Sequence, residues 1–127
     1  RIIHFQISLS EQSNHNRLNV YFEPQDAKST SFIKNELFPL FQNASDIAER
    51  VSLKLVPFGN AICNTDNQDY GCVCSQGPAE CDLMRLMACT LHDYRRHENA
   101  LDTIACIQGR PSLEDAINNC VKKLPNR

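Results

Sequence analysis

The sequence predicts a single-domain α/β protein, with a βαβ unit in residues 1–61 and a cysteine-rich, helical part in residues 62–127. Two strand-like patterns flank a helix-like pattern in the first part, which favours parallel strands joined by a right-handed crossover. Helical periodicity dominates the second part, which also holds all seven cysteines, from Cys63 to Cys120. A length of 127 residues suits one compact domain.

Three segments of the first part have strand-like patterns. Residues 3–9 and 18–22 alternate apolar and polar side chains, the period of a half-buried strand. The polar stretch 11–16 between them reads as a loop, so the two strands can pair as a hairpin. Residues 51–56 are rich in strand-forming residues and end at the turn-forming segment 57–60.

Helical spacing places Phe32, Ile33, Leu37 and Phe41 on one face, and Pro39 is expected to kink or shorten the last turn of this helix.

In the second part, residues 83–94 and 101–105 are predicted helices, and the leucine and methionine side chains of residues 83–91 are expected to lie in the core. A third helix is predicted to open at Pro111, with a capping pair formed by Ser112 and Asp115.

Composition excludes several classes of function. The net charge is −2, from 13 basic and 15 acidic residues, so the clustered basic excess of a nucleic-acid or anionic-membrane binder is not expected. No apolar run approaches the roughly 18 residues of a membrane span, and no signal peptide is recognisable. Seven cysteines and the glycosylation sequon at Asn43 favour a secreted protein, with the lysosome as the alternative. No cofactor and no metal are expected.

Four segments resemble the family of gamma-interferon-inducible lysosomal thiol reductases (GILT), over roughly residues 18–122. The segments are Val20–Glu23, Phe32–Pro39, Leu55–Ala61 and Cys74–Cys81 followed by Cys89. The last is similar to the family signature Cys-Gln-His-Gly-x-x-Glu-Cys-x-x-Asn-x-x-x-x-Cys, except that Ser75-Gln76 replaces Gln-His and Met84 replaces Asn. Secreted insect members, such as those of mosquito saliva, are candidate owners of this sequence.

The resemblance implies a thioredoxin-like fold with a disulfide-stapled helical insertion, and reduction of protein disulfides at acidic pH. That activity uses a Cys-x-x-Cys at the amino end of the first helix, where the helix end lowers the pKa of the attacking thiol. Here those positions hold Asp26 and Ser29, and no cysteine precedes Cys63. Asp26 is instead expected to cap the helix, which contributes about 1 kcal/mol.

The family also continues into a β-hairpin with a cis-proline, which this chain lacks before it ends at Arg127. The resemblance therefore implies an incomplete or modified thioredoxin-like βαβ unit, either truncated or rebuilt, in which residues 3–9 substitute for a missing sheet partner.

The predicted function is that of a secreted, catalytically inactive GILT-like protein. It is expected to bind a protein partner, on a host or microbial surface, in a role of the immune-modulation type. The alternative is a residual thiol-disulfide oxidoreductase that uses Cys72 and Cys74. A third interpretation is a fragment of a longer reductase-like protein.

Three disulfides and one unpaired cysteine are expected, although spacing alone leaves 105 arrangements open. The pairing we favour joins Cys63 to Cys72, Cys74 to Cys89 and Cys106 to Cys120, and leaves Cys81 over. With Cys81 unpaired, a monomer is expected, and a covalent dimer through Cys81 is the alternative.

Recognition of the partner is expected to use residues that are not needed in the hydrophobic core. These lie in the polar loop 64–71 and the charged patch His92–Glu98. Aromatic and arginine side chains tend to dominate binding energy. The binding candidates are therefore Tyr70, Tyr94, Arg95 and Arg96. The alternative is that all four are simply solvated.

Overall fold

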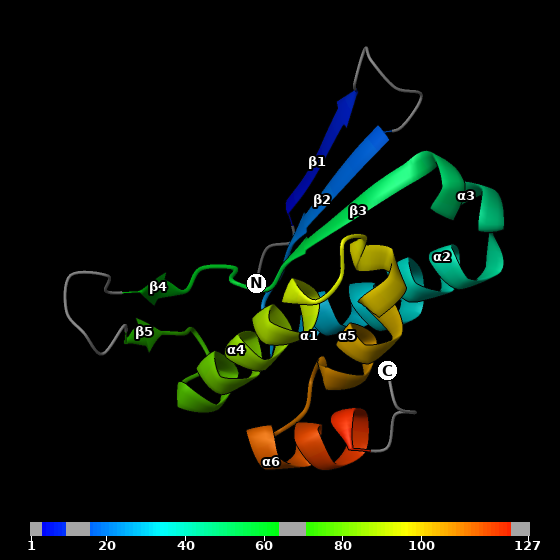
Figure 1. The fold of residues 1–127 in the computed structure, drawn as a ribbon. Helices are drawn as coiled ribbons and strands as arrows, with labels where there is room; N and C mark the ends of the chain where they lie inside the picture. The colour runs from blue at the N-terminus through cyan, green and yellow to red at the C-terminus, as the bar shows by residue number, and fades with distance from the viewer. Residues whose placement is uncertain (1–3, 10–15, 64–70, 123–127) are drawn as a thin grey trace.

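The computed structural model describes residues 4–9, 16–63 and 71–122. A three-stranded sheet lies along one side of the helices, and a small two-stranded arm projects from the body (Figure 1). Residue 3 of the first predicted strand and Tyr70 lie outside the described residues.

The sheet has the order β1 (His4–Leu9), β2 (Asn16–Tyr21) and β3 (Val51–Val56). β1 pairs antiparallel with β2, as the hairpin prediction required, and β3 pairs parallel with β2. Leu18 lies opposite Leu53, and Val20 lies opposite Leu55. The predicted βαβ connectivity is therefore confirmed.

A nearly continuous helical segment connects β2 to β3. It consists of α1 (Ala27–Phe32), a π-helical segment η1 (Ile33–Leu37) and α2 (Phe38–Asn43). Pro39 lies in the first turn of α2, directly after the wider π-helical turn, so the chain stays helical past the proline. A further helix, α3 (Ser45–Arg50), was not predicted from the sequence.

The second part of the chain contains the helices that cover the sheet. The described elements are β4 (Ile62–Cys63), β5 (Cys72–Val73), α4 (Pro78–His92), η2 (His97–Ala100), α5 (Leu101–Ile107), α6 (Leu113–Ala116) and η3 (Ile117–Val121). The hydroxyl of Ser112 accepts a hydrogen bond from the Asp115 amide at 3.1 Å, which confirms the predicted cap. Ser112 itself is the N-cap of α6, so Pro111 precedes the helix and does not lie in its first turn.

One hydrophobic core joins the sheet to the helices. Val20 and Leu55 of the sheet and Leu83, Met87 and Ile104 of the helices are all at most 2% exposed and belong to one packed cluster. Burying each such side chain contributes roughly 1.5–3 kcal/mol. The predicted core role of the leucine and methionine stripe on α4 is confirmed.

Three disulfides join described cysteines. The bonds Cys63–Cys72 and Cys106–Cys120 confirm two predicted pairs. The third joins Cys74 to Cys81, so the prediction of Cys74–Cys89 with Cys81 left over was wrong. The free cysteine is Cys89, which is exposed.

The geometry of α4 explains this correction. The helix begins at Pro78, so Cys74 lies beside its first turn, which contains Cys81. Eight residues of α-helix span about 12 Å, which places Cys89 far beyond the reach of Cys74. A covalent dimer through Cys81 is excluded in this bonding pattern, because that sulfur is already bonded.

Side chains of η2 occupy the outer edge of β3. The Leu55 amide donates to Nδ1 of His97 at 2.8 Å, and the Leu53 amide donates to Oε1 of Glu98 at 3.3 Å. Burial lowers the pKa of His97, and the charge of Lys54 lowers it further, while Glu98 acts in the opposite direction. Because Nδ1 of His97 accepts a hydrogen bond, the folded state requires the neutral form of the ring.

We predict that part of the folding stability is lost as pH falls from about 6.5, the ordinary pKa of histidine, through the lower pKa of folded His97. Above this window the neutral ring is present in both states. Within it the unfolded chain binds the proton more readily than the folded chain, and below it both carry the proton and the loss is complete. Urea unfolding across this pH range measures the loss. In His97→Asn, whose Oδ1 can accept the same hydrogen bond without titrating, the loss is smaller, whereas the exposed-site control His92→Asn follows the parent. An unchanged slope in His97→Asn would contradict this account.

Candidate functional site

The amino end of α1 is built as a helix cap. Asp26 precedes the helix with extended backbone, and its carboxylate accepts a hydrogen bond from the Ser29 amide at 3.0 Å. The Ser29 side chain is fully buried, and its hydroxyl accepts a hydrogen bond from the Glu23 amide at 3.1 Å. Both side chains are therefore held by backbone groups around the first turn, and the predicted cap at Asp26 is confirmed.

Burial alone would raise the pKa of the Asp26 carboxyl group. Hydrogen bonds to its carboxylate, including the one from the Ser29 amide, outweigh this and lower the pKa below its ordinary value. A charged carboxylate is also the form that the positive end of a helix stabilises.

Two buried glutamates hold this region together, and sequence reasoning assigned a role to neither. Glu80, 2% exposed, accepts hydrogen bonds from the amides of Gln25 at 2.9 Å and Gln76 at 3.1 Å. Its position in the signature-like segment Cys74–Cys81 was the available signal. The carboxylate joins the start of α1 to the loop that enters α4.

Glu23, also 2% exposed, connects a second pair of loops to the end of β2. Its carboxylate accepts hydrogen bonds from the Asn60 amide and the Ser75 hydroxyl, both at 3.1 Å. Gly59 has a positive φ of 50°, and a Cβ atom there would collide with Cγ of Glu23. The glycine of the predicted turn is thus required both by its backbone angle and by the glutamate packed against it.

The loop after α5 packs against the segment that leads into α1. Nε2 of Gln108 donates to the Glu23 carbonyl at 2.7 Å and to the Thr30 hydroxyl at 3.0 Å. The Gly109 amide donates to the Pro24 carbonyl at 2.8 Å. These contacts join residues near 24 to residues near 108, and no local sequence pattern announces them.

Cys72 and Cys74, which the alternative hypothesis uses as a redox pair, do not form a dithiol. Cys72 is bonded to Cys63, and Cys74 is bonded to Cys81, so the two neighbours belong to separate bridges. All four cysteines, Cys63, Cys72, Cys74 and Cys81, are consumed by these two disulfides. Among the described residues, no group of three histidine, cysteine or acidic side chains is placed to hold a metal ion.

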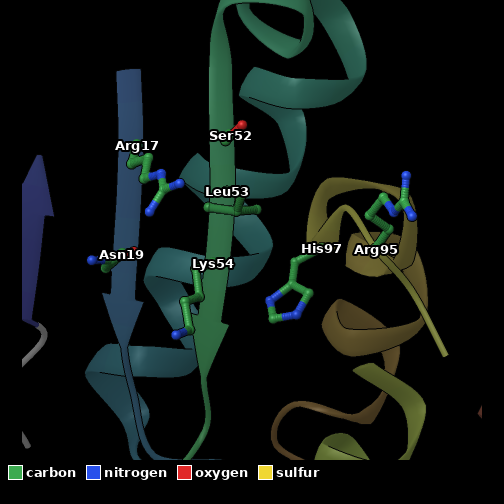
Figure 2. Close-up of a pocket in the computed structure, with 7 residues that line it drawn as sticks. All are labelled: Arg17, Asn19, Ser52, Leu53, Lys54, Arg95 and His97. Atoms are coloured by element: carbon green, nitrogen blue, oxygen red, sulfur yellow. The ribbon is translucent and has the colours of Figure 1, made fainter. Parts of the chain in front are cut away.

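A pocket of about 430 Å³ lies on the sheet beside the edge of β3 (Figure 2). It is lined by Arg17, Asn19, Ser52, Leu53, Lys54, Arg95 and His97. Arg17 and Asn19 come from β2, and Ser52 and Lys54 come from β3. None of the seven lining residues is acidic, and only one of them, Arg95, was among the binding candidates proposed from the sequence.

The remaining binding candidates differ in how freely they are presented. Tyr94 is half-buried and packs against the core. Arg96 donates to Oε2 of Glu98 at 2.5 Å and to the Ala48 carbonyl at 2.7 Å. Arg95 is exposed at the rim of the pocket. Asn43 of the sequon is exposed at the end of α2.

In the part of the chain that the structure describes, no helix is both long and apolar enough to cross a membrane.

These features define a disulfide-bridged α/β protein in which a capped helix follows the central strand and a bridged, helical part covers the sheet. The chain belongs to the GILT family: the family model described as gamma interferon inducible lysosomal thiol reductase matches residues 17–124.

Individual relatives agree with this assignment. A GILT-like protein of Caenorhabditis elegans is 31% identical over 113 residues, covering 87% of this chain and 34% of that protein. A gamma-interferon-inducible lysosomal thiol reductase-like protein of Anopheles gambiae is 28% identical over 105 residues, covering 76% and 42%. The gamma-interferon-inducible lysosomal thiol reductase of the mouse is 28% identical over 106 residues, covering 84% and 41%. The chain thus spans between about a third and two fifths of the length of these relatives.

We predict that Glu80→Gln destabilises the fold by roughly 1–3 kcal/mol, because an amide nitrogen replaces one of two buried acceptors and leaves a backbone amide unpaired. Urea unfolding at neutral pH measures the change. Glu114→Gln is the matched control, since Glu114 also lies in the first turn of a helix but is exposed. Equal stability of the Glu80→Gln variant and the parent would show that the carboxylate is not required.

Proposed function

We propose that this GILT-family chain is not a thiol reductase and that it acts by binding another protein. The observation that carries the proposal is the amino end of α1, where Asp26 and Ser29 stand at the positions expected for the family's two cysteines. The Asp26 carboxylate accepts a hydrogen bond from the Ser29 amide, and the Ser29 hydroxyl accepts one from the Glu23 amide before the helix, which supports a structural role for both. No cysteine precedes Cys63 in the sequence.

The chemistry of disulfide reduction explains why the residue at position 26 decides whether the protein can be a reductase. Reduction requires a thiolate that attacks a disulfide sulfur and forms a mixed disulfide. A carboxylate at a helix start is stabilised by the same positive helix end, but it cannot form that sulfur–sulfur bond. We therefore infer that the change at Asp26 removes the reaction while keeping the stability of the helix start.

The alternative, a reductase that uses Cys72 and Cys74, requires a different bonding pattern. Both sulfurs are bonded to other cysteines, so two bridges would have to open before a dithiol existed there. The exposed Cys89 has no second free thiol among the described residues with which to close a disulfide. These bonds favour a scaffold over a redox centre.

We further propose that the unit from β2 through α1 to β3 is a thioredoxin-like βαβ unit. Its parallel pairing and crossover helices support this. We propose that β1, which pairs antiparallel with β2, substitutes for the missing sheet partner. One hydrophobic core shared by residues on both sides of position 61 supports a single domain.

The compartment that we propose is extracellular, with the lysosome as the alternative. Three disulfides are compatible with either, and the exposed Asn43 supports glycosylation of the sequon. Within the charged patch His92–Glu98, Arg95 is the strongest binding candidate. It is exposed, and among the described residues it has no carboxylate partner. A partner on a host or microbial surface remains the proposed target.

We predict no reduction of insulin disulfides at acidic or neutral pH, measured with the mouse reductase as the positive control. The attacking thiolate is missing at Asp26, so the rate should equal that of the reducing buffer alone. Cys89→Ser should leave this result unchanged. Turnover that survives Cys89→Ser but is lost when Cys72 and Cys74 are replaced would support the alternative instead.

We predict that Arg95→Ala weakens binding of the protein partner by about tenfold, a usual loss for an interface arginine at a hot spot. The partner is first captured from the native fluid and identified, and affinities are then measured with purified proteins. Arg85→Ala is the matched control, because Arg85 is an exposed arginine on α4. Full binding by Arg95→Ala and Tyr70→Ala, with loss in Asp26→Ala or Ser29→Ala, would place recognition at the start of α1.

A further inference from the structure

The pocket beside the edge of β3 gathers positive charge, and none of the residues that line it is acidic. Arg17, Lys54 and Arg95 are exposed side chains from three separate segments, and all three line it. Among the described residues, no carboxylate forms an ion pair with any of them. From this arrangement we propose that the pocket binds a small sugar that carries a phosphate or sulfate ester.

The sheet fixes the spacing of the groups that would bind it. In the parallel register of β2 and β3, Arg17 lies opposite Ser52, and Asn19 lies opposite Lys54. Neighbouring strands are about 4.8 Å apart, so these four side chains form a compact block on the polar face of the sheet. Leu53 and Leu55, which flank Lys54 in sequence, are buried on the opposite face and hold β3 in place. The site is therefore anchored on strands and not on a loop alone.

His97 adds a directed neutral donor to the same pocket. Its Nδ1 accepts the hydrogen bond from Leu55, so in the neutral ring the proton is carried by Nε2. Figure 2 shows the ring between β3 and the segment that carries Arg95. An anion in the pocket would meet this N–H as well as the charged groups.

The mixture of groups favours an ester of a sugar over a bare anion. Arginine and lysine bind phosphate and sulfate oxygens through short, charge-assisted hydrogen bonds. The Asn19 amide and the Ser52 hydroxyl are neutral groups suited to the hydroxyls of a sugar. A volume of about 430 Å³ lies within the roughly 300–1,000 Å³ of small-molecule sites. The pocket thus has room for more than the tetrahedral group.

The test measures binding of glucose 6-phosphate, glucose 6-sulfate, inorganic phosphate and glucose by titration calorimetry and amide chemical shifts at low salt. We expect saturable binding of at least one ester, stronger than that of inorganic phosphate, and no binding of glucose. Lys54→Gln and Arg17→Gln should each weaken the ester about tenfold or more. Lys28→Gln, an exposed lysine on α1, is the matched control and should bind like the parent.

Two further measurements distinguish a phosphate ester, a sulfate ester and a general acidic ligand. A phosphate ester loses a charge below its second pKa of about 6, so its affinity should fall between neutral and mildly acidic pH, whereas a sulfate ester keeps its charge. Equal binding of a glutamate-rich peptide would overturn the ester assignment in favour of a general acidic-ligand surface.

Absence of saturable binding of both esters by the parent, or equal weakening in Lys28→Gln, would overturn the proposal. Near-ultraviolet circular dichroism verifies that each variant is folded. Lys54 and Arg17 lie outside the patch His92–Glu98, so loss of ester binding in their variants is scored separately from loss of the protein partner.

Discussion

The carboxylate of Glu80 accepts hydrogen bonds from two backbone segments, one of which lies 55 residues away in sequence. The β2–α1 connection and the entry to α4 therefore share one buried acceptor group. A buried carboxylate without such partners would be strongly unfavourable, so the two loops and the charge require one another. Glu23 repeats the arrangement for the turn after β3 and the Ser75 hydroxyl. Hydrogen bonds to the carboxylates of Glu80 and Glu23 therefore fix the loops around the helix start that bears Asp26 and Ser29.

The long-period features of the fold could be predicted from the sequence. Alternation in β2 and helical spacing through Phe32 and Leu37 are set by burial of one face, which leaves a clear pattern. Short elements leave no such pattern, which is why α3 and the two-residue strands β4 and β5 were missed. The Cys74–Cys81 bridge depended on where α4 begins. The reversal at Gly77, which has a φ of 102°, brings Cys74 back to the first turn of α4.

The candidate sites also differ in whether local sequence or long-range contacts create them. The cap at Asp26 is a local feature, because the residue, the helix start and the Ser29 amide lie within four positions, and it could be predicted. The pocket depends on strand register, which places Asn19 beside Lys54, and on the chain returning at His97 to the free edge of β3. No window of sequence contains these contacts. The charged patch was recognised as a surface, but its relation to Arg17 and Lys54 was not.

The way in which the β3 edge is blocked bears on whether two copies of this protein can associate through their sheets. An uncovered edge strand is a template on which another chain can add a strand, and proteins usually block it with bulges, prolines or charges. Here the blocking groups are the side chains of His97 and Glu98, which occupy the two amides directly. The block at the Leu55 amide requires the neutral ring of His97, because only then can Nδ1 accept the hydrogen bond, whereas a neighbouring strand would carry no such requirement. Protection of this edge at Leu55 is therefore tied to the charge of a single imidazole, and burial, which lowers the pKa of His97, extends the pH range over which the edge stays blocked.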